Sequence, residues 1–206
     1  MAITNGYTTL AQIKQALRIP TADTIDDELL ELSIEGASRT IDGVADRVFY
    51  QTVDDTRVFI PDSNFLVEID DLATLTSLKT SSNADGVFDI TFSASDFQLE
   101  PLNAISGGQA SPFTRIKAVG DFLFPTYDPK TTNSQEATVQ VVGTFGWPSV
   151  PVAIKQATLI LAMRQFKRYD SPLGVSGFGD IGVIRVGRTD PDVEALVHPF
   201  KRIRGA

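Results

Sequence analysis

The spacing of apolar residues changes twice along this 206-residue chain, and these changes constrain its fold more than any other feature. Between residues 9 and 48 apolar residues recur every three or four positions, as on one face of a helix. Between residues 50 and 145 they form short runs that alternate with polar residues or stop at turn residues, which is typical of strands. Helical spacing returns after Pro151. The sequence therefore predicts a strand-rich segment bracketed by helices.

Two helices are expected before the strands. Thr9 and Gln12 have the spacing of a capping box, which starts a helix that Pro20 ends. A second helix is predicted from a cap at Thr24, with acidic residues in its first turn that suit the positive end of the helix dipole. Leu29 and Leu32 widen its apolar seam. The seam itself has coiled-coil spacing and consists of Leu30, Ile34, Ala37, Ile41, Val44 and Val48.

The middle of the chain predicts strands and no helix. Turn residues such as Pro61-Asp62 separate the apolar runs. The acidic pairs Asp54-Asp55 and Asp70-Asp71 are interpreted as turns at strand ends, because no calcium-loop pattern accompanies them. About seven strands are expected, over 57–60, 65–69, 75–79, 88–92, 97–100, 114–119 and 137–142.

Two further helices are expected after the strands. The first runs from Pro151 to about Tyr169, is apolar on nearly all sides and should be mostly buried. Trp147, just before it, is interpreted as an apolar staple that fixes the entry of the helix. The second is short, with Asp190 as its cap, proline at the first helical position and Pro199 as its end.

These elements predict an α+β fold. An antiparallel-type bundle of about four helices carries a large all-β domain inserted between the second and third helices. The helical domain comprises residues 1–48 and 146–206, and the inserted domain comprises residues 49–145. A chain of 206 residues is long enough for one domain with a large insertion.

Charge and composition restrict the possible functions. The first 150 residues carry 9 basic and 21 acidic side chains, whereas the last 56 carry 9 and 5. The acidic part excludes a general DNA-binding surface, because phosphate contacts require cations. The basic end is either a solvated surface or a contact for an acidic partner. The chain has no cysteine, which excludes disulfides and thiolate metal sites, and no apolar run long enough to span a membrane.

The motifs indicate no catalytic, cofactor or metal site, so we do not expect an enzyme. Residues 177–182 match GxGxxG, but a helix precedes and a strand follows, the reverse of a dinucleotide site. We interpret this segment as a hinge loop. His198, the single histidine, has no nucleophile elbow to serve and is interpreted as a helix end. Carboxylate pairs for glycoside hydrolysis stay open, since their spacing is spatial. The hinge glycines are Gly174, Gly177, Gly179 and Gly182.

The basic C-terminal tail is either mobile or a partner-binding element. Phe200 precedes its three cations, Lys201, Arg202 and Arg204. We expect that deletion of residues 200–206 weakens partner binding and leaves the fold intact.

The helical parts resemble a known family. The run GTFGWPSVPVAIKQATLILAMRQFKRYDSPLGVSGFGDIGVIRVGRTDPDVEALVHPF and the phrase FQLEPLNA at 97–104 are similar to the head-to-tail connector (adaptor) proteins of long-tailed double-stranded DNA bacteriophages. The resemblance covers about residues 8–48 and 142–200. The smallest members of that family are nearly all helix, so the β insertion departs from their pattern and its role stays open.

The resemblance implies a structural virion protein without cofactor. Such proteins form a ring, typically of twelve copies, beneath the portal; it extends the DNA channel, links capsid to tail and supports the next neck or tail protein. This places the chain in the neck, at the head–tail junction, after assembly in the host cytoplasm. The C-terminal segment would reach the portal through Phe200, Lys201, Arg202 and Arg204.

An acidic channel would let double-stranded DNA pass without specific binding, because acids repel phosphate. The candidate lining residues on the second helix are Glu28, Glu31, Glu35 and Asp42. Three alternatives remain at this stage. One is another neck component, such as a head-closure or tail-terminator protein. The others are a glycan-binding module or carbohydrate-active enzyme that uses the β domain, and a helical DNA-binding regulator.

Overall fold

The computed structural model describes residues 3–83, 85–103, 105–106, 108–126, 137–169 and 190–202. The chain divides into two compact units. The helical unit comprises Met1–Tyr50 and Ser149–Ala206, and the β unit comprises Gln51–Pro148. Both boundaries fall a few residues later than the sequence suggests. Phe49 belongs with the helices because its ring packs edge-on against Tyr7 and Phe200.

The first two helices differ in how well their ends were predicted. Helix α1, Leu10–Leu17, begins with the predicted capping box, which is confirmed. Helix α2 spans Asp27–Ala45, so it begins and ends three residues inside its predicted limits of 24 and 48. Asp46 ends it in a left-handed conformation (φ 51°). The end of the predicted seam is therefore wrong, and Val44 and Val48 are 43% and 39% exposed.

The last helices are α3, Val152–Lys167, and α4, Pro191–Val197. The predicted cap of α4 is confirmed, because the Asp190 carboxylate accepts a hydrogen bond from the backbone of Asp192 (3.0 Å). A 3-10 turn, His198–Phe200, follows directly, so Pro199 lies inside this turn. Helix α3 is less buried than predicted. Its buried residues are Ile154, Ala157, Thr158 and Ala162.

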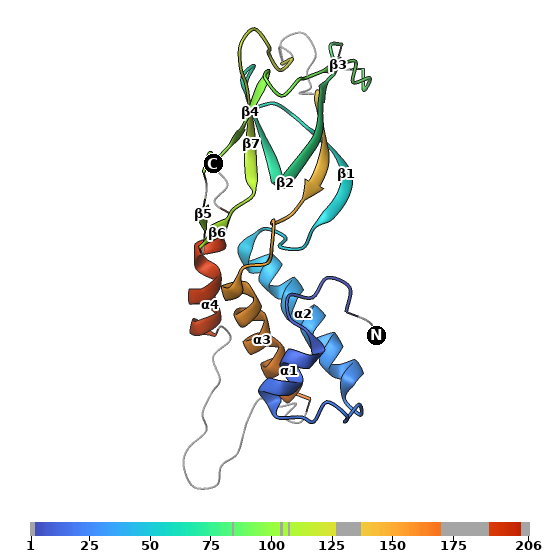
Figure 1. The fold of residues 1–206 in the computed structure, drawn as a ribbon, viewed down its shortest axis with the longest axis vertical. Coiled ribbons are helices and arrows are strands. Elements are labelled where there is room, and N and C mark those ends of the chain that lie inside the picture. The colour runs from blue at the N-terminus through green and yellow to red at the C-terminus, as the bar shows by residue number, and fades with distance from the viewer. Residues whose placement is uncertain are drawn as a thin grey trace. The chain divides into compact units, whose positions relative to one another are not determined.

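The core of the helical unit joins α1, α2 and α3, and the ribbon shows α2 and α3 packed along each other (Figure 1). Gly36 permits this close approach of α2 and α3. A Cβ atom at this position would lie 3.1 Å from the Gln165 side-chain oxygen, which is a tight contact. The buried core residues are Ile13, Leu30, Ile34, Ala37 and Ala162.

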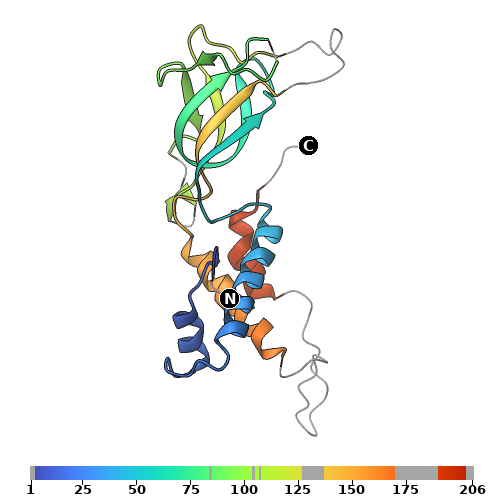
Figure 2. The same cartoon turned by 90° about the vertical axis from the view of Figure 1, so that its right-hand side faces the viewer.

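The β unit is built on one antiparallel sheet with strand order β1-β8-β2-β7-β4, and β3 pairs with β2. Figure 2 shows the strands curling around the core of the unit. A separate two-stranded ribbon pairs β5 with β6. The strands are β1 Thr52–Phe59, β2 Leu66–Thr80, β3 Ile90–Thr91, β4 Phe97–Glu100, β5 Ile105–Ser106, β6 Gln109–Ala110, β7 Phe113–Ala118 and β8 Val139–Phe145.

The long strand β2 corrects the sequence prediction of a turn at Asp70-Asp71. Both residues lie inside one strand of 15 residues, which replaces the two strands predicted at 65–69 and 75–79. Asp70 stays in the strand as an ion-pair partner of Arg57 (2.8 Å). Asp71 is buried and accepts a hydrogen bond from the indole of Trp147 (3.2 Å). Partners distant in sequence therefore accommodate the two acids.

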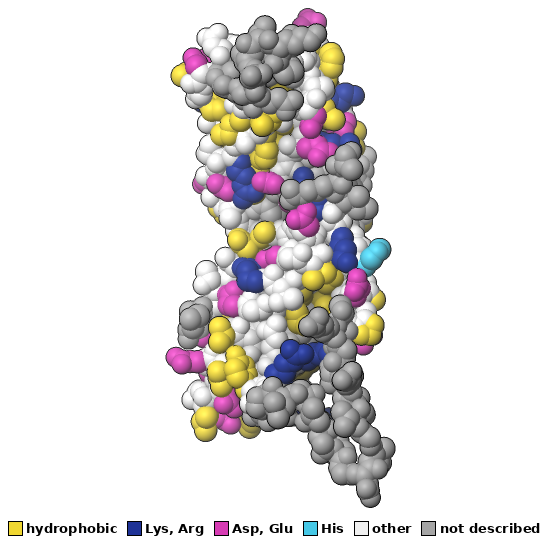
Figure 3. Space-filling model, turned by 180° about the vertical axis from the view of Figure 1, so that it is seen from behind, with side chains coloured by type: hydrophobic (Ala, Val, Ile, Leu, Met, Phe, Trp, Pro, Cys, Tyr) yellow, Lys and Arg dark blue, Asp and Glu magenta, His cyan; other side chains and the backbone are white. Residues whose placement is uncertain are grey.

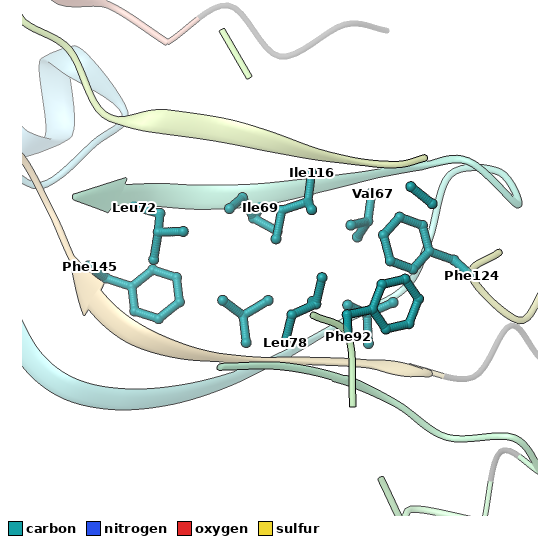
Figure 4. Close-up of a cluster of buried hydrophobic side chains, with 11 residues drawn as sticks. Val67, Ile69, Leu72, Leu78, Phe92, Ile116, Phe124 and Phe145 are labelled. Carbon is teal, nitrogen blue, oxygen red and sulfur yellow. The ribbon is translucent and has the colours of Figure 1, made fainter. Parts of the chain in front are cut away.

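The core of the β unit is apolar and continuous. Figure 4 shows its buried side chains meeting between the strands, among them Leu72, Ile116 and Phe145. Phe92 stacks on Phe124 with ring centroids 5.5 Å apart. Gly143 lets β8 approach β2 closely, since a Cβ atom there would lie 2.3 Å from the Thr74 carbonyl oxygen.

Candidate interaction surfaces

The part of the chain that the structure describes holds no group of three or more potential metal-ligating side chains. Within the same residues, no helix has the length and apolarity that crossing a membrane would need. His198 caps the C-terminal end of α4, in keeping with its interpretation as a helix end. The surfaces of the helical unit are therefore of most interest.

Two of the four candidate channel-lining acids hold the N-terminal segment. The Glu35 carboxylate accepts hydrogen bonds from the backbone of Thr4 (2.5 Å) and Asn5 (2.9 Å). The Asp42 carboxylate accepts one from the Tyr7 hydroxyl (2.5 Å) and pairs with Arg39 (2.8 Å). Glu28 is exposed and Glu31 is partly exposed. The four acids thus differ in surroundings, although they follow one helix.

Tyr7 lies at the centre of a polar network. Its hydroxyl accepts a hydrogen bond from the backbone of Phe49 (2.9 Å) while donating to Asp42. Burial, followed by the hydrogen bond to Asp42, raises the pKa of Tyr7 above its usual range. Burial also raises the pKa of Asp42, although Tyr7 and Arg39 act in the opposite direction. Arg39 lies over the rings of Tyr7 (5.5 Å) and Tyr50 (4.9 Å).

Phe200 belongs to the core of the helical unit. Only 2% of its surface is exposed, and the centroid of its ring lies 6.1 Å from the centroid of the Phe49 ring. The backbone of Arg202 donates to the carbonyl of Ala45 (2.9 Å), so the segment also covers the end of α2. Deletion of residues 200–206 would remove a buried aromatic ring, so from the structure we expect it to destabilise the helical unit as well as to weaken partner binding.

Not all predicted residues can be placed. Lys201 pairs with Glu194 (3.1 Å), and both Lys201 and Arg202 are partly exposed. Arg204 and the four hinge glycines, Gly174, Gly177, Gly179 and Gly182, lie outside the described residues.

Helix α2 carries a second apolar line that the sequence reasoning assigned to the core. Ile25, directly before the helix, is 89% exposed, Leu29 is 38% exposed and Leu32 is 46% exposed. Leu29 and Leu32 are three residues apart within α2 and so lie on one side of the helix, and Ile25 precedes them in the turn before it. We call Ile25, Leu29 and Leu32 the outer seam. In the helical unit, hydrophobic side chains gather together with acidic ones over the side where α2 lies (Figure 3).

A groove of about 550 Å³ lies between α1 and α3. Its apolar surface comes from Leu17, Ile160 and Met163. Its cations are Arg18, Arg164 and Lys167, of which Arg164 pairs with Asp190 at the start of α4 (3.1 Å). We call this the α1–α3 groove.

The β unit exposes apolar residues on its edge strand β1, where Val53 is 70% and Val58 is 46% exposed. Between them, the Arg57 guanidinium binds Asp55 (2.9 Å) and Asp70 and lies 4.2 Å above the centre of the Phe145 ring. The hydrogen bond from Arg57 lowers the pKa of Asp55. Asp55 and Arg57 alternate with the exposed Val58 along β1, so this charge pairing lies on the partly buried face of the strand.

The chain is similar to a protein among the solved structures. No family model and no curated protein matches the chain. A chain in the solved structure described as "Neck of empty GTA particle computed with C6 symmetry" is 22% identical, with a TM-score of 0.58. The match covers 100% of this chain and 95% of that chain. The two proteins therefore share a fold over both the helical unit and the β unit.

Proposed function

We propose that this chain is a structural protein of the neck of a phage-like particle, where it acts as a head-to-tail connector beneath the portal. The observation that carries the proposal is the full-length match to a chain from a particle neck, which includes the β unit. That neck was computed with C6 symmetry. Sixfold symmetry accords with a ring of repeated copies, and a ring of twelve is one arrangement that it permits.

In this role the ring extends the DNA channel and links capsid to tail. Each copy carries a net charge of −8, so the ring as a whole repels phosphate. Glu28 is the best candidate for the channel lining, because it is exposed, whereas Glu31, Glu35 and Asp42 are partly buried. DNA would slide past such a lining without specific binding.

The C-terminal segment is the proposed contact with the portal. Phe200 anchors the segment in the helical unit, and Lys201 and Arg202, both partly exposed, bring positive charge that suits an acidic partner surface. The β unit would contact the next neck or tail protein. The protein would assemble in the host cytoplasm and end in the virion neck.

Localisation in particles tests the proposal directly. A chain carrying an epitope tag should be labelled at the head–tail junction in electron micrographs. Particles made without the chain should stop as DNA-filled heads that lack tails. Complete tailed particles without the chain would contradict the proposal.

Portal binding can be tested separately with matched charge reversals. Lys201→Glu/Arg202→Glu should weaken binding to the portal protein. Arg115→Glu/Lys117→Glu makes the same charge change at two exposed positions of β7 and should preserve that binding. Equal effects of the two pairs would contradict the assignment of the C-terminal segment.

A further inference from the structure

The outer seam of α2 has the features of a helix-docking surface. Apolar residues of a surface helix normally face its own core, and α2 already buries Leu30, Ile34 and Ala37 in this way. Leu29 and Leu32 add a second apolar line, which remains substantially exposed. The spacing of three between Leu29 and Leu32 is that of one of the ridges by which a helix packs into the groove of another.

The α1–α3 groove complements the outer seam in polarity. Leu17, Ile160 and Met163 offer an apolar surface to leucine side chains. A groove between two helices is a common receptor for the apolar face of a third helix. The groove therefore fits a helix such as α2.

Charge complementarity favours a second copy of this chain as the occupant. Asp26 and Glu28 are exposed beside the outer seam, at the start of α2. Arg18 and Lys167 border the groove, and Arg164 is already paired with Asp190. Acids beside the seam would meet cations beside the groove, which favours this pairing over a seam that meets another seam.

The seam and the groove lie on different faces of the helical unit. The inner side of α2 packs against α1 and α3, which directs the outer seam away from them. One copy therefore cannot place its own seam in its own groove. Contacts between two different faces join copies head to tail, and such contacts close into a ring when the rotation permits.

We propose that the outer seam of each copy docks in the α1–α3 groove of the next copy. This inference rests on the proposed function and specifies the contact between neighbouring copies in the ring. Leu29 and Leu32 enter the groove against Ile160 and Met163, and the acids beside the seam face Arg18 and Lys167.

The cysteine-free sequence permits a direct test by disulfide trapping. The full-length variant Leu32→Cys/Met163→Cys places one thiol in the seam and one in the groove. A disulfide forms only where the two Cα atoms approach within about 7 Å. Under mild oxidation we expect a ladder of dimers and higher multiples on a non-reducing gel, at least about tenfold more abundant than with either single variant, because docking raises the effective thiol concentration.

Control variants define what would overturn the inference. Val53→Cys/Met163→Cys, which moves the first thiol to an exposed apolar site on β1, should stay monomeric. A ladder of equal strength from this control would show random collision. Efficient dimers from Leu32→Cys alone would show seam-to-seam contact. A double variant that yields only monomer would exclude the pairing. Each of these three outcomes would overturn the inference.

The inference and the proposed function can fail independently. Trapping uses the purified chain alone, whereas the neck location is read from particles. A ladder with labelling outside the neck would keep the contact and reject the connector role. Labelling at the neck without a ladder would support the connector role and exclude the proposed contact between copies.

Discussion

The two units of this protein achieve stability in different ways. The β unit uses one continuous segment, closed on itself where Thr52 pairs with Phe145, around an apolar core. The helical unit combines two segments from opposite ends of the chain. Contacts between the two segments tie them together, including the ring of Phe200 against Phe49 and the backbone of Arg202 with the carbonyl of Ala45.

This difference shows where assembly can act. The β unit is complete without either chain end, so it suits a self-contained module that contacts another protein. The helical unit depends on both ends, and its C-terminal segment contains the residues proposed for portal binding. Contacts made at that segment therefore bear directly on the stability of the unit.

The largest expected effect is on fragments. Residues 51–148 alone should fold, because their sheet and core are internal to the segment. Residues 1–50 alone should remain unfolded, since their core residues lose α3. Circular dichroism and chemical denaturation of the two fragments provide the measurement. A cooperative transition in the short fragment, or none in the long one, would contradict the comparison.

The next effect concerns the C-terminal anchor. Phe200→Ala should lower the free energy of unfolding by about 3–5 kcal/mol, the usual cost of truncating a buried phenylalanine. Lys201→Ala, its partly exposed neighbour, should change it by less than about 1 kcal/mol. Denaturant titration of both variants checks this. Similar stabilities would mean that the segment does not belong to the core.

Two glycines test close approach in the two units. Gly143→Ala should cost about 1–3 kcal/mol, because its methyl group would meet the Thr74 carbonyl in the sheet. Gly43→Ala in α2 has open space around the new methyl group and should stabilise the helical unit by up to about 1 kcal/mol. The midpoint of thermal unfolding should fall for Gly143→Ala and rise for Gly43→Ala. Shifts of the same sign would contradict the close packing at Gly143 and the open space at Gly43.

The next effects concern the network at Tyr7. Tyr7→Phe should cost about 1–3 kcal/mol, because the buried backbone of Phe49 loses its acceptor. Tyr50→Phe keeps the ring over which Arg39 lies and serves as the control. Denaturant titration at neutral pH compares the two variants. A loss from Tyr50→Phe as large as that from Tyr7→Phe would contradict the role of the Tyr7 hydroxyl.

The same network predicts a pH dependence. Burial raises the pKa of Asp42 above its ordinary value of 3.8, so the folded protein holds this proton at a pH where the unfolded chain has lost it. The Asp42 contribution to stability is therefore greatest at low pH and declines as pH rises through the raised pKa. Asp42→Asn should remove this decline, whereas Glu28→Gln should keep it. Unfolding curves at several pH values provide the measurement, and an unchanged profile for Asp42→Asn would contradict the assignment.

Local signals in the sequence predicted the starts of α1 and α4 well, but not that of α2, which begins at Asp27 without a side-chain cap. The capping box at Thr9 and the cap at Asp190 involve residues within three positions, so their chemistry is readable without the fold. The pair Asp70-Asp71 was misread as a turn because its partners, Arg57 and Trp147, are distant in sequence. Local pattern cannot reveal such partners.

The candidate surfaces were harder to predict than the elements. Leu29 and Leu32 fit a widened core seam equally well in sequence, and only the packing of α1 and α3 decides which side of α2 is exposed. In the sequence Phe200 resembles part of a tail, because no neighbouring residue indicates its contact with Phe49. That residue lies before the β unit and is distant in sequence. Burial between distant segments is a property of the fold.

The mass of the protein in solution, measured with and without portal protein, tests the central claim most directly. Native mass spectrometry or light scattering should show that the portal protein converts the free chain into a complex with several copies per portal ring. A chain that stays monomeric and unbound at concentrations where the portal ring is intact would contradict the connector role.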